Sequence, residues 1–137
     1  MSFDEIIRKQ LVIKEDIMET RSMGTMEEKL NLAKKYGLSE QDLKGFLRNI
    51  YLSRKLDDAE INMRKQNKAF FQISSAGHEG ILSAIAKVLK PKYDYFIPYY
   101  RDRALCLALG VTPYEMLCQA NGNVGDKSSH GRQMPAH

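Results

Sequence analysis

Residues 38–68 read LSEQDLKGFLRNIYLSRKLDDAEINMRKQNK, with apolar side chains at positions 43, 46, 47, 50 and 51 among many charges. This spacing places the apolar side chains on one face of a helix. Ser39 stands where such a helix would begin, because its hydroxyl can accept a hydrogen bond from an amide of the first turn. The stretch therefore predicts one long amphipathic helix over about residues 40–67. We expect its charged side chains to face solvent, as they do on most such helices.

Two shorter helices are predicted before this stretch. Residues 4–20 carry apolar side chains at a helical spacing among charges. Thr25 and Glu28 have the spacing of a capping box, in which each side chain bonds to the backbone amide of the other residue. The second helix is therefore expected over about residues 26–36, and Gly37 is suited to end it.

From residue 69 the character of the sequence changes. FFQISSAGHEG (70–80) is short and rich in small residues. A compact apolar helix is expected to begin at His78 and to end just before Pro91. The following stretch YDYFIPYYRD (93–102) is aromatic, and we expect it to be extended and partly buried.

Two further helices are predicted after the aromatic stretch. ALCLALG (104–110) is expected to be helical and to stop at its glycine. Thr112, Pro113 and Glu115 combine an N-cap, a proline at the first helical position and a capping-box acid. These three residues predict a second helix, which runs to about Asn121. This portion of the chain is therefore predicted to be mainly α-helical.

The last residues, NGNVGDKSSHGRQMPAH (121–137), have no apolar periodicity and predict a long loop. Domains rarely finish on an open loop of this length. We therefore expect the chain to continue beyond it. The predicted division is an N-terminal helical segment, 1–68, and a second domain that starts at residue 69 and is incomplete at its C-terminal end.

The composition argues against several classes of protein. The chain has 21 basic and 17 acidic residues, and residues 1–68 hold 14 of the basic and 12 of the acidic ones. The surplus of positive charge is therefore spread along the chain and does not form the basic stripe of a nucleic-acid-binding protein. No apolar run approaches the roughly 18 residues that cross a bilayer, and the first residues do not read as a signal peptide. The cytoplasm or an organelle matrix is the expected compartment.

Cys106 and Cys118 lack metal-site spacing and are expected to be unpaired, buried thiols.

Residues able to bind a small ligand gather in loops after residue 73. Arg101 is a permanent cation that resists burial without an anionic partner, yet it stands between aromatic and aliphatic residues. Ordinary structural explanations exist as well. Arg101 could pair with Asp102, Tyr99 and Tyr100 could be core aromatics with their hydroxyls at the surface, and His78 could be a polar first-turn residue.

Three motifs taken in order resemble a known family. They are GHEG (77–80), YYRDRAL (99–105) with LALG after it, and GRQMPAH (131–137). This order resembles the α subunits of the thiamine-diphosphate-dependent 2-oxo acid dehydrogenases, over about residues 45–137. The last motif is most similar to the branched-chain (2-oxoisovalerate) type, since the pyruvate type usually reads GGSMH. His78 departs from the usual Gln or Glu, so its role stays open.

The resemblance implies a fold and a set of roles. The parent enzyme would have an α/β thiamine-diphosphate-binding fold, with this portion as its mainly helical N-terminal part and residues 69–137 as the start of the cofactor domain. Tyr100 and Arg101 would bind the cofactor's diphosphate, with Tyr99 beside them, because a guanidinium fork matches phosphate oxygens. His137 would be the catalytic residue at the substrate end, where an imidazole can orient a carboxylate or move a proton.

The resemblance also implies an activity and partners. The activity would be oxidative decarboxylation of a 2-oxo acid, with acyl transfer to the lipoyl group of an acyltransferase component. A β subunit or β domain and a homo- or hetero-oligomer are expected. The magnesium ligands of this family lie in a GDG segment that this chain lacks, so we expect them downstream and expect the chain alone to be inactive. The alternatives are a pyruvate or acetoin dehydrogenase α-type chain and a non-catalytic helical interaction module built on residues 40–67.

Overall fold

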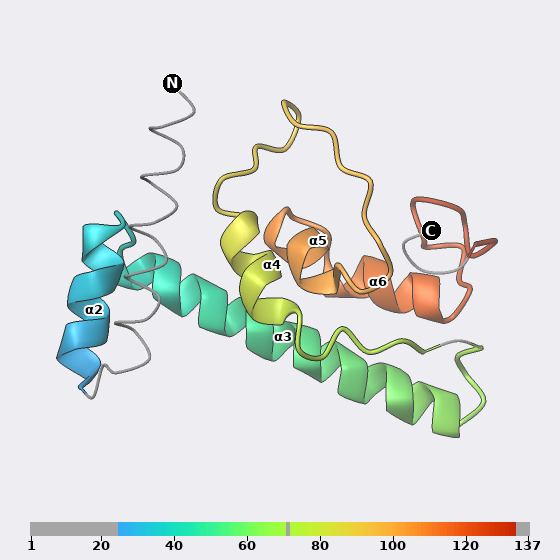
Figure 1. The fold of residues 1–137 in the computed structure, drawn as a ribbon. Coiled ribbons are helices and arrows are strands. Elements are labelled where there is room, and N and C mark those ends of the chain that lie inside the picture. The colour runs from blue at the N-terminus through green and yellow to red at the C-terminus, as the bar shows by residue number, and fades with distance from the viewer. Residues whose placement is uncertain (1–24, 71, 134–137) are drawn as a thin grey trace. The chain divides into compact units, whose positions relative to one another are not determined.

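The computed structural model describes residues 25–70 and 72–133. Within these ranges the chain forms five α-helices and no strand, as predicted for this portion (Figure 1). The predicted helix at residues 4–20 and the predicted catalytic residue His137 lie outside the described residues. The helices are α2 (Met26–Lys35), α3 (Glu40–Lys65), α4 (Glu79–Ile85), α5 (Arg103–Ala108) and α6 (Pro113–Ala120).

The chain divides into two compact units, Met1–Leu43 and Lys44–His137. In the first unit, α2 begins with the predicted capping box: the Glu28 amide donates to the Thr25 hydroxyl at 3.2 Å, and the Thr25 amide donates to Glu28 Oε2 at 3.0 Å. Gly37 follows α2 with a positive φ of 73°, a conformation that glycine adopts without strain. Both ends of this helix were therefore predicted from local sequence.

Helix α3 begins as predicted, because the Asp42 amide donates to the Ser39 hydroxyl at 3.1 Å. The expectation that its charged side chains face solvent is wrong for two of them. Asp57 is 4% exposed and Glu60 is 3% exposed. They can be buried because an arginine from a distant segment pairs with both, and this partner cannot be seen from the helix alone.

The core of the second unit is small, and its buried apolar residues come from α3, α4, α5 and α6 and from Ala69. The Asn49 side chain of α3 donates to the Ser83 hydroxyl of α4 at 2.8 Å and to the Ala104 carbonyl of α5 at 2.7 Å. One amide group thus ties three helices together, and Figure 1 shows α4 and α5 side by side along α3. The buried apolar residues of the described chain are Leu56, Ala69, Leu82, Ala104, Met116, Cys118 and Ala120.

Two predictions about residues 79–102 need correction. Helix α4 ends at Ile85 rather than just before Pro91, because the chain tightens into turns in which the amides of residues 87 and 88 bond three residues back. The aromatic stretch is not buried at its start: Tyr93 and Tyr95 are 81% and 102% exposed. No described helix covers this segment, which arches away from the helices in Figure 1.

The last two helices follow their predicted limits. Helix α5 is followed by Gly110, and α6 starts with the predicted capping box, in which the Glu115 amide donates to the Thr112 hydroxyl at 3.2 Å. Both cysteines are free thiols, as expected; Cys118 is buried, whereas Cys106 is only half-buried. Within the described ranges, none of the helices combines the length and the apolar character that a membrane span requires.

Candidate functional site

Tyr99, Tyr100 and Arg101 lie in the turn that leads into α5. The turn is closed from both sides, because the Asp102 amide donates to the Tyr99 carbonyl and the Tyr99 amide donates to Asp102 Oδ2, both at 2.8 Å. Asp102 is the residue at the N-cap of α5. Its carboxylate therefore closes the turn, and the alternative of an Arg101–Asp102 ion pair does not describe this site.

The two tyrosines and the arginine form one polar cluster. The rings of Tyr99 and Tyr100 have centroids 3.8 Å apart, and the Arg101 guanidinium carbon lies 5.4 Å from the centroid of the Tyr100 ring. A hydrogen bond between the two hydroxyls raises the pKa of Tyr99 and lowers that of Tyr100, and Arg101 lowers the pKa of Tyr100 further. Two hydroxyls and a guanidinium are thus grouped on one partly exposed turn.

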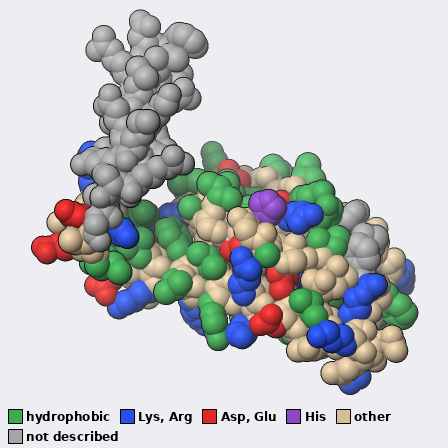
Figure 2. Space-filling view, turned by 60° about the horizontal axis from the view of Figure 1, so that its bottom comes forward, with side chains coloured by type: hydrophobic (Ala, Val, Ile, Leu, Met, Phe, Trp, Pro, Cys, Tyr) green, Lys and Arg blue, Asp and Glu red, His purple; other side chains and the backbone are tan. Residues whose placement is uncertain are grey.

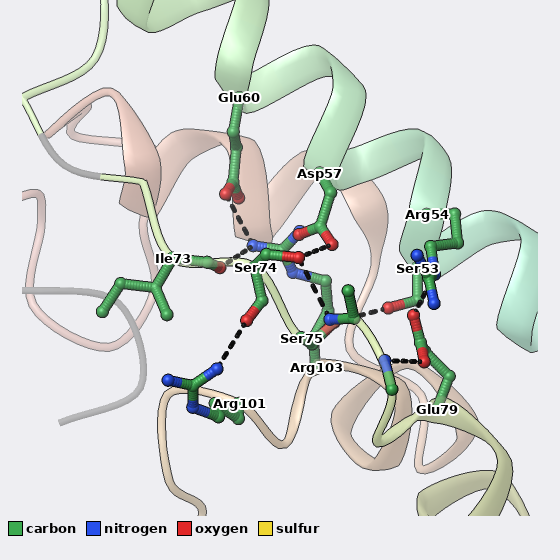
Figure 3. Close-up of polar contacts among 12 residues, drawn as sticks. Ser53, Arg54, Asp57, Glu60, Ile73, Ser74, Ser75, Glu79, Arg101 and Arg103 are labelled. Atoms are coloured by element: carbon green, nitrogen blue, oxygen red, sulfur yellow. Dashed lines mark hydrogen bonds and ion pairs between the residues drawn. The ribbon is translucent and has the colours of Figure 1, made fainter.

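The Arg101 guanidinium has little to neutralise it. Its Nη1 donates to the Ser74 backbone carbonyl over a long 3.4 Å (Figure 3). Among the described residues it makes no ion pair with a carboxylate. A half-buried guanidinium with neutral hydroxyls beside it and no internal anion is suited to bind an anion from outside.

Arg103, two residues further on, has the opposite surroundings. Its Nη1 lies 2.5 Å from Asp57 Oδ1, and its Nη2 lies 2.6 Å from Glu60 Oε2, so it pairs with two carboxylates of α3 (Figure 3). Burial raises the pKa of Glu60, and this effect outweighs the opposing effect of Arg103. The sequence analysis missed this cluster. The signal that could have found it is a pair of acids one helical turn apart on α3, at a position where the apolar stripe would continue.

The GHEG loop contributes a buried acid rather than a buried histidine. Glu79 is 3% exposed, pairs with Arg54 of α3 and accepts from the Gly77 amide at 2.7 Å. His78 is exposed at the N-cap of α4 and makes no side-chain capping bond. Its position agrees with the structural explanation, a polar residue at a helix start.

The loop after α6 is organised by one residue that the sequence analysis did not single out. Asp126 is 1% exposed, and its carboxylate accepts from the amides and hydroxyls of Ser128 and Ser129 at 2.6–3.1 Å. It also accepts from the Gly131 amide at 3.2 Å and from the Gln119 side chain at 3.3 Å. Burial acts to raise the pKa of Asp126, but these donors outweigh it and the pKa is lowered.

Gly131, the first residue of the GRQMPAH motif, is fixed by this loop. Its φ is +76°, and a Cβ added to it would collide with the backbone of Gly122. Only glycine fits such a close approach. Tyr99, Tyr100 and Arg101 lie together in one turn, and their role at the cofactor stays a prediction. The described residues contain no group of three or more His, Cys, Asp or Glu side chains that could hold a metal ion.

Comparisons with known proteins give a family and two relatives for this chain. The family model described as "Dehydrogenase E1 component" matches residues 48–137. The chain is 35% identical over 101 residues to the 2-oxoisovalerate dehydrogenase subunit alpha of Bacillus subtilis, covering 74% of this chain and 31% of that protein. It is 29% identical over 108 residues to the pyruvate dehydrogenase E1 component subunit alpha of the same organism, covering 79% of this chain and 28% of that protein.

No solved structure matches the chain. The chain spans less than a third of the length of either relative. Residues 48–137 make up well over half of the chain and contain α4, α5, α6, most of α3 and the Tyr–Arg turn. Because the family model covers this share of the sequence, the chain belongs to the dehydrogenase E1 component family.

Proposed function

We propose that this chain is part of the decarboxylating component of a 2-oxo acid dehydrogenase complex, acting on a branched-chain 2-oxo acid. The complete enzyme would decarboxylate the 2-oxo acid oxidatively and transfer the acyl group to the lipoyl group of an acyltransferase component. Family membership favours this enzyme over a non-catalytic helical module. The higher identity to the 2-oxoisovalerate relative, 35% against 29%, favours the branched-chain type over the pyruvate type.

The observation that supports this proposal most directly is the state of Arg101. It lies within the matched family region, makes no ion pair among the described residues, and has the hydroxyls of Tyr99 and Tyr100 beside it. These donors suit the diphosphate of thiamine diphosphate, and we assign Tyr99, Tyr100 and Arg101 to its binding. Bound there, the cofactor would supply the electron sink for decarboxylation, while the protein supplies position and charge.

Magnesium would bind through residues other than the described ones. Two charges on a diphosphate exceed what one guanidinium neutralises, so a divalent cation fits the proposed site chemically. The magnesium ligands are assigned to the rest of the enzyme. The acid that activates the cofactor is assigned to a β subunit or β domain. The chain by itself is accordingly proposed to be inactive, and turnover of a 2-oxo acid by residues 1–137 alone, with cofactor and magnesium, would contradict this.

The role of Arg101 is tested by titrating thiamine diphosphate into variants of the complete enzyme. We expect Arg101→Ala to raise the dissociation constant about 10- to 150-fold, which corresponds to the roughly 1.5–3 kcal/mol of a hydrogen bond to a charged group. Arg101→Lys should recover part of this, because it keeps the charge but not the planar fork. Arg48→Ala, at an exposed arginine of α3, is the control. An unchanged dissociation constant in Arg101→Ala would remove Arg101 from the cofactor site.

His137 is proposed as the catalytic residue at the substrate end. In the complete enzyme, His137→Asn should lower turnover about 10²- to 10⁴-fold, the usual contribution of a general acid or base. Cofactor affinity should change little, since His137 is assigned to the opposite end from Arg101. His130→Asn, at an exposed histidine of the same loop, is the matched control. Turnover retained within about threefold in His137→Asn would return this residue to an ordinary loop position.

The substrate, partners and compartment are proposed with the same activity. Turnover of 2-oxoisovalerate and of pyruvate by the complete enzyme, measured side by side, distinguishes the two types. The proposed partners are a lipoylated acyltransferase component and a β subunit or β domain, in a homo- or hetero-oligomer of the cytoplasm or an organelle matrix. Neither nucleic acid nor a membrane is a proposed partner. On the face shown in Figure 2, basic side chains are scattered over the described residues rather than gathered in one stripe.

A further inference from the structure

The loop between α3 and α4 is held against α3 by two serines. The Ser74 hydroxyl donates to Asp57 Oδ2 at 2.7 Å and accepts from the Ala76 amide at 3.0 Å. The Ser75 hydroxyl is 2.9 Å from the Ser53 hydroxyl, and both serines of this second pair are fully buried. The loop backbone at residues 73–76 is therefore fixed to α3 by side-chain bonds rather than by regular secondary structure.

The carboxylate that holds Ser74 is itself fixed. Asp57 Oδ1 pairs with Arg103, whose guanidinium also pairs with Glu60 and approaches the Ile73 carbonyl at 3.5 Å. Asp57 and Glu60 stand one turn apart on α3, so the rigid helix sets the position of both acids. Each oxygen of Asp57 thus has a defined partner, and the Ser74 hydroxyl meets a carboxylate that cannot turn away from it.

The Ser74 backbone carbonyl faces the Tyr–Arg turn and accepts from Arg101 Nη1 at 3.4 Å. Figure 3 shows these contacts as a continuous path from Glu60 through Arg103, Asp57 and Ser74 to Arg101. The path ends in the same segment that contains Arg103, because Arg101 and Arg103 are two residues apart. The side chain of Arg101 is therefore aimed by an acceptor whose own position depends on α3.

From this geometry we propose that Ser74 and Asp57 are positioning residues for the anion-binding side chain of Arg101. Ser74 fixes the carbonyl that orients the guanidinium, and Asp57 fixes Ser74. Neither residue is proposed to touch the cofactor or the substrate. The inference rests on the proposed role of Arg101, and it adds two residues of the neighbouring loop and helix to that site.

The test measures thiamine diphosphate binding to variants of the complete enzyme by titration. Ser74→Ala should raise the dissociation constant about threefold to tenfold, the effect of losing a hydrogen bond of ordinary strength. Ser74→Thr keeps a hydroxyl and should restore affinity. Asp57→Asn should weaken binding at least as much as Ser74→Ala, whereas Asp58→Asn, at the exposed acid next to it, should leave affinity unchanged.

A double variant separates positioning from a general loss of structure. If Ser74 acts through Arg101, Ser74→Ala should weaken binding in the wild-type background and have no further effect in an Arg101→Ala background. Equal weakening in both backgrounds, or unchanged affinity in Ser74→Ala, overturns the positioning role. If Arg101→Ala itself leaves affinity unchanged, the proposed function of Arg101 has failed instead. Melting temperatures recorded for each variant show whether a fall in affinity reflects unfolding of the site.

Discussion

Arg101 and Arg103 stand two residues apart, yet the structure places them in opposite surroundings. Arg103 is 9% exposed and pairs with Asp57 and Glu60 at 2.5 and 2.6 Å. Arg101 donates over a long 3.4 Å to the Ser74 carbonyl, interacts with Tyr99 and Tyr100, and makes no ion pair among the described residues. Two arginines on either side of Asp102 thus differ: Arg103 is a paired, structural cation, and Arg101 is the one that we propose binds an external anion.

The difference follows from where the chain turns. Asp102 closes the turn before α5, so the residues on either side of it point to different neighbours. Arg103 is the first residue of α5 and meets the acids of α3, whereas Arg101 remains in the turn beside two tyrosines. A buried ion pair rarely adds much stability over an apolar core, but breaking one is costly because the remaining charge stays buried. The paired arginine should therefore govern stability and the unpaired one should govern binding.

The largest expected effect on stability is that of Arg103→Met. It leaves two buried carboxylates without a cation, and we expect a loss of about 3–5 kcal/mol in the free energy of unfolding. Arg101→Met should lose far less, because no buried partner is left behind. Chemical unfolding of both variants of the complete protein measures the difference. Equal losses from the two substitutions would mean that the two arginines contribute alike to stability.

The next effect concerns Asp126, a buried charge whose partners among the described residues are neutral donors. Asp126→Asn replaces a charged acceptor of serine and glycine donors, and we expect a loss of about 1–3 kcal/mol in the free energy of unfolding. Because the folded-state pKa of Asp126 is lowered, its contribution should be fully present above the ordinary pKa of 3.8 and decline as the pH falls through the folded value. Unfolding measured from pH 7 down to the acid limit tests this, and a difference from wild type that stays constant with pH would contradict it.

Glu60→Gln should have a smaller effect with the opposite dependence on pH. Burial raises the folded-state pKa of Glu60, so its contribution is fully present below the ordinary pKa of 4.5 and is lost as the pH rises through the raised value. Relative to wild type, the glutamine variant should therefore gain stability as the pH rises above 4.5, by less than the loss expected for Asp126→Asn. A variant that instead loses stability over this range would show that Arg103 needs both anions.

The smallest effect is expected for an ion pair at the surface. Lys127 pairs with Glu115 at 2.6 Å, and Lys127, Thr112 and the capping geometry lower the pKa of Glu115 to about 2. The lysine side chain is 82% exposed, so solvent screens the pair. Lys127→Ala should leave the melting temperature unchanged within measurement error at both low and high salt. A clear fall in the melting temperature at low salt would mean that exposure to solvent does not make this ion pair weak.

The sequence by itself determined the described helices and most of their ends. Thr25 with Glu28, and Thr112 with Glu115, cap α2 and α6 as predicted. These signals are local, since a cap and the amide that it satisfies lie within four residues of each other. The ordered motifs also indicated the family, to which residues 48–137 were then matched. The end of α4 was predicted too late, because its apolar residues continue past the point where the chain turns.

Only the tertiary structure decided which charges are buried and which arginine has no carboxylate partner within the part of the chain that the structure describes. Asp57 and Glu60 read as solvated because their partner, Arg103, lies 46 and 43 residues further along the chain. From the sequence, Asp126 was indistinguishable from an ordinary loop residue, because its hydrogen-bond donors surround it only in the folded loop. An ion pair between distant segments produces no periodic pattern in the sequence of either segment. Its contribution to stability depends on burial, which exists only in the folded chain.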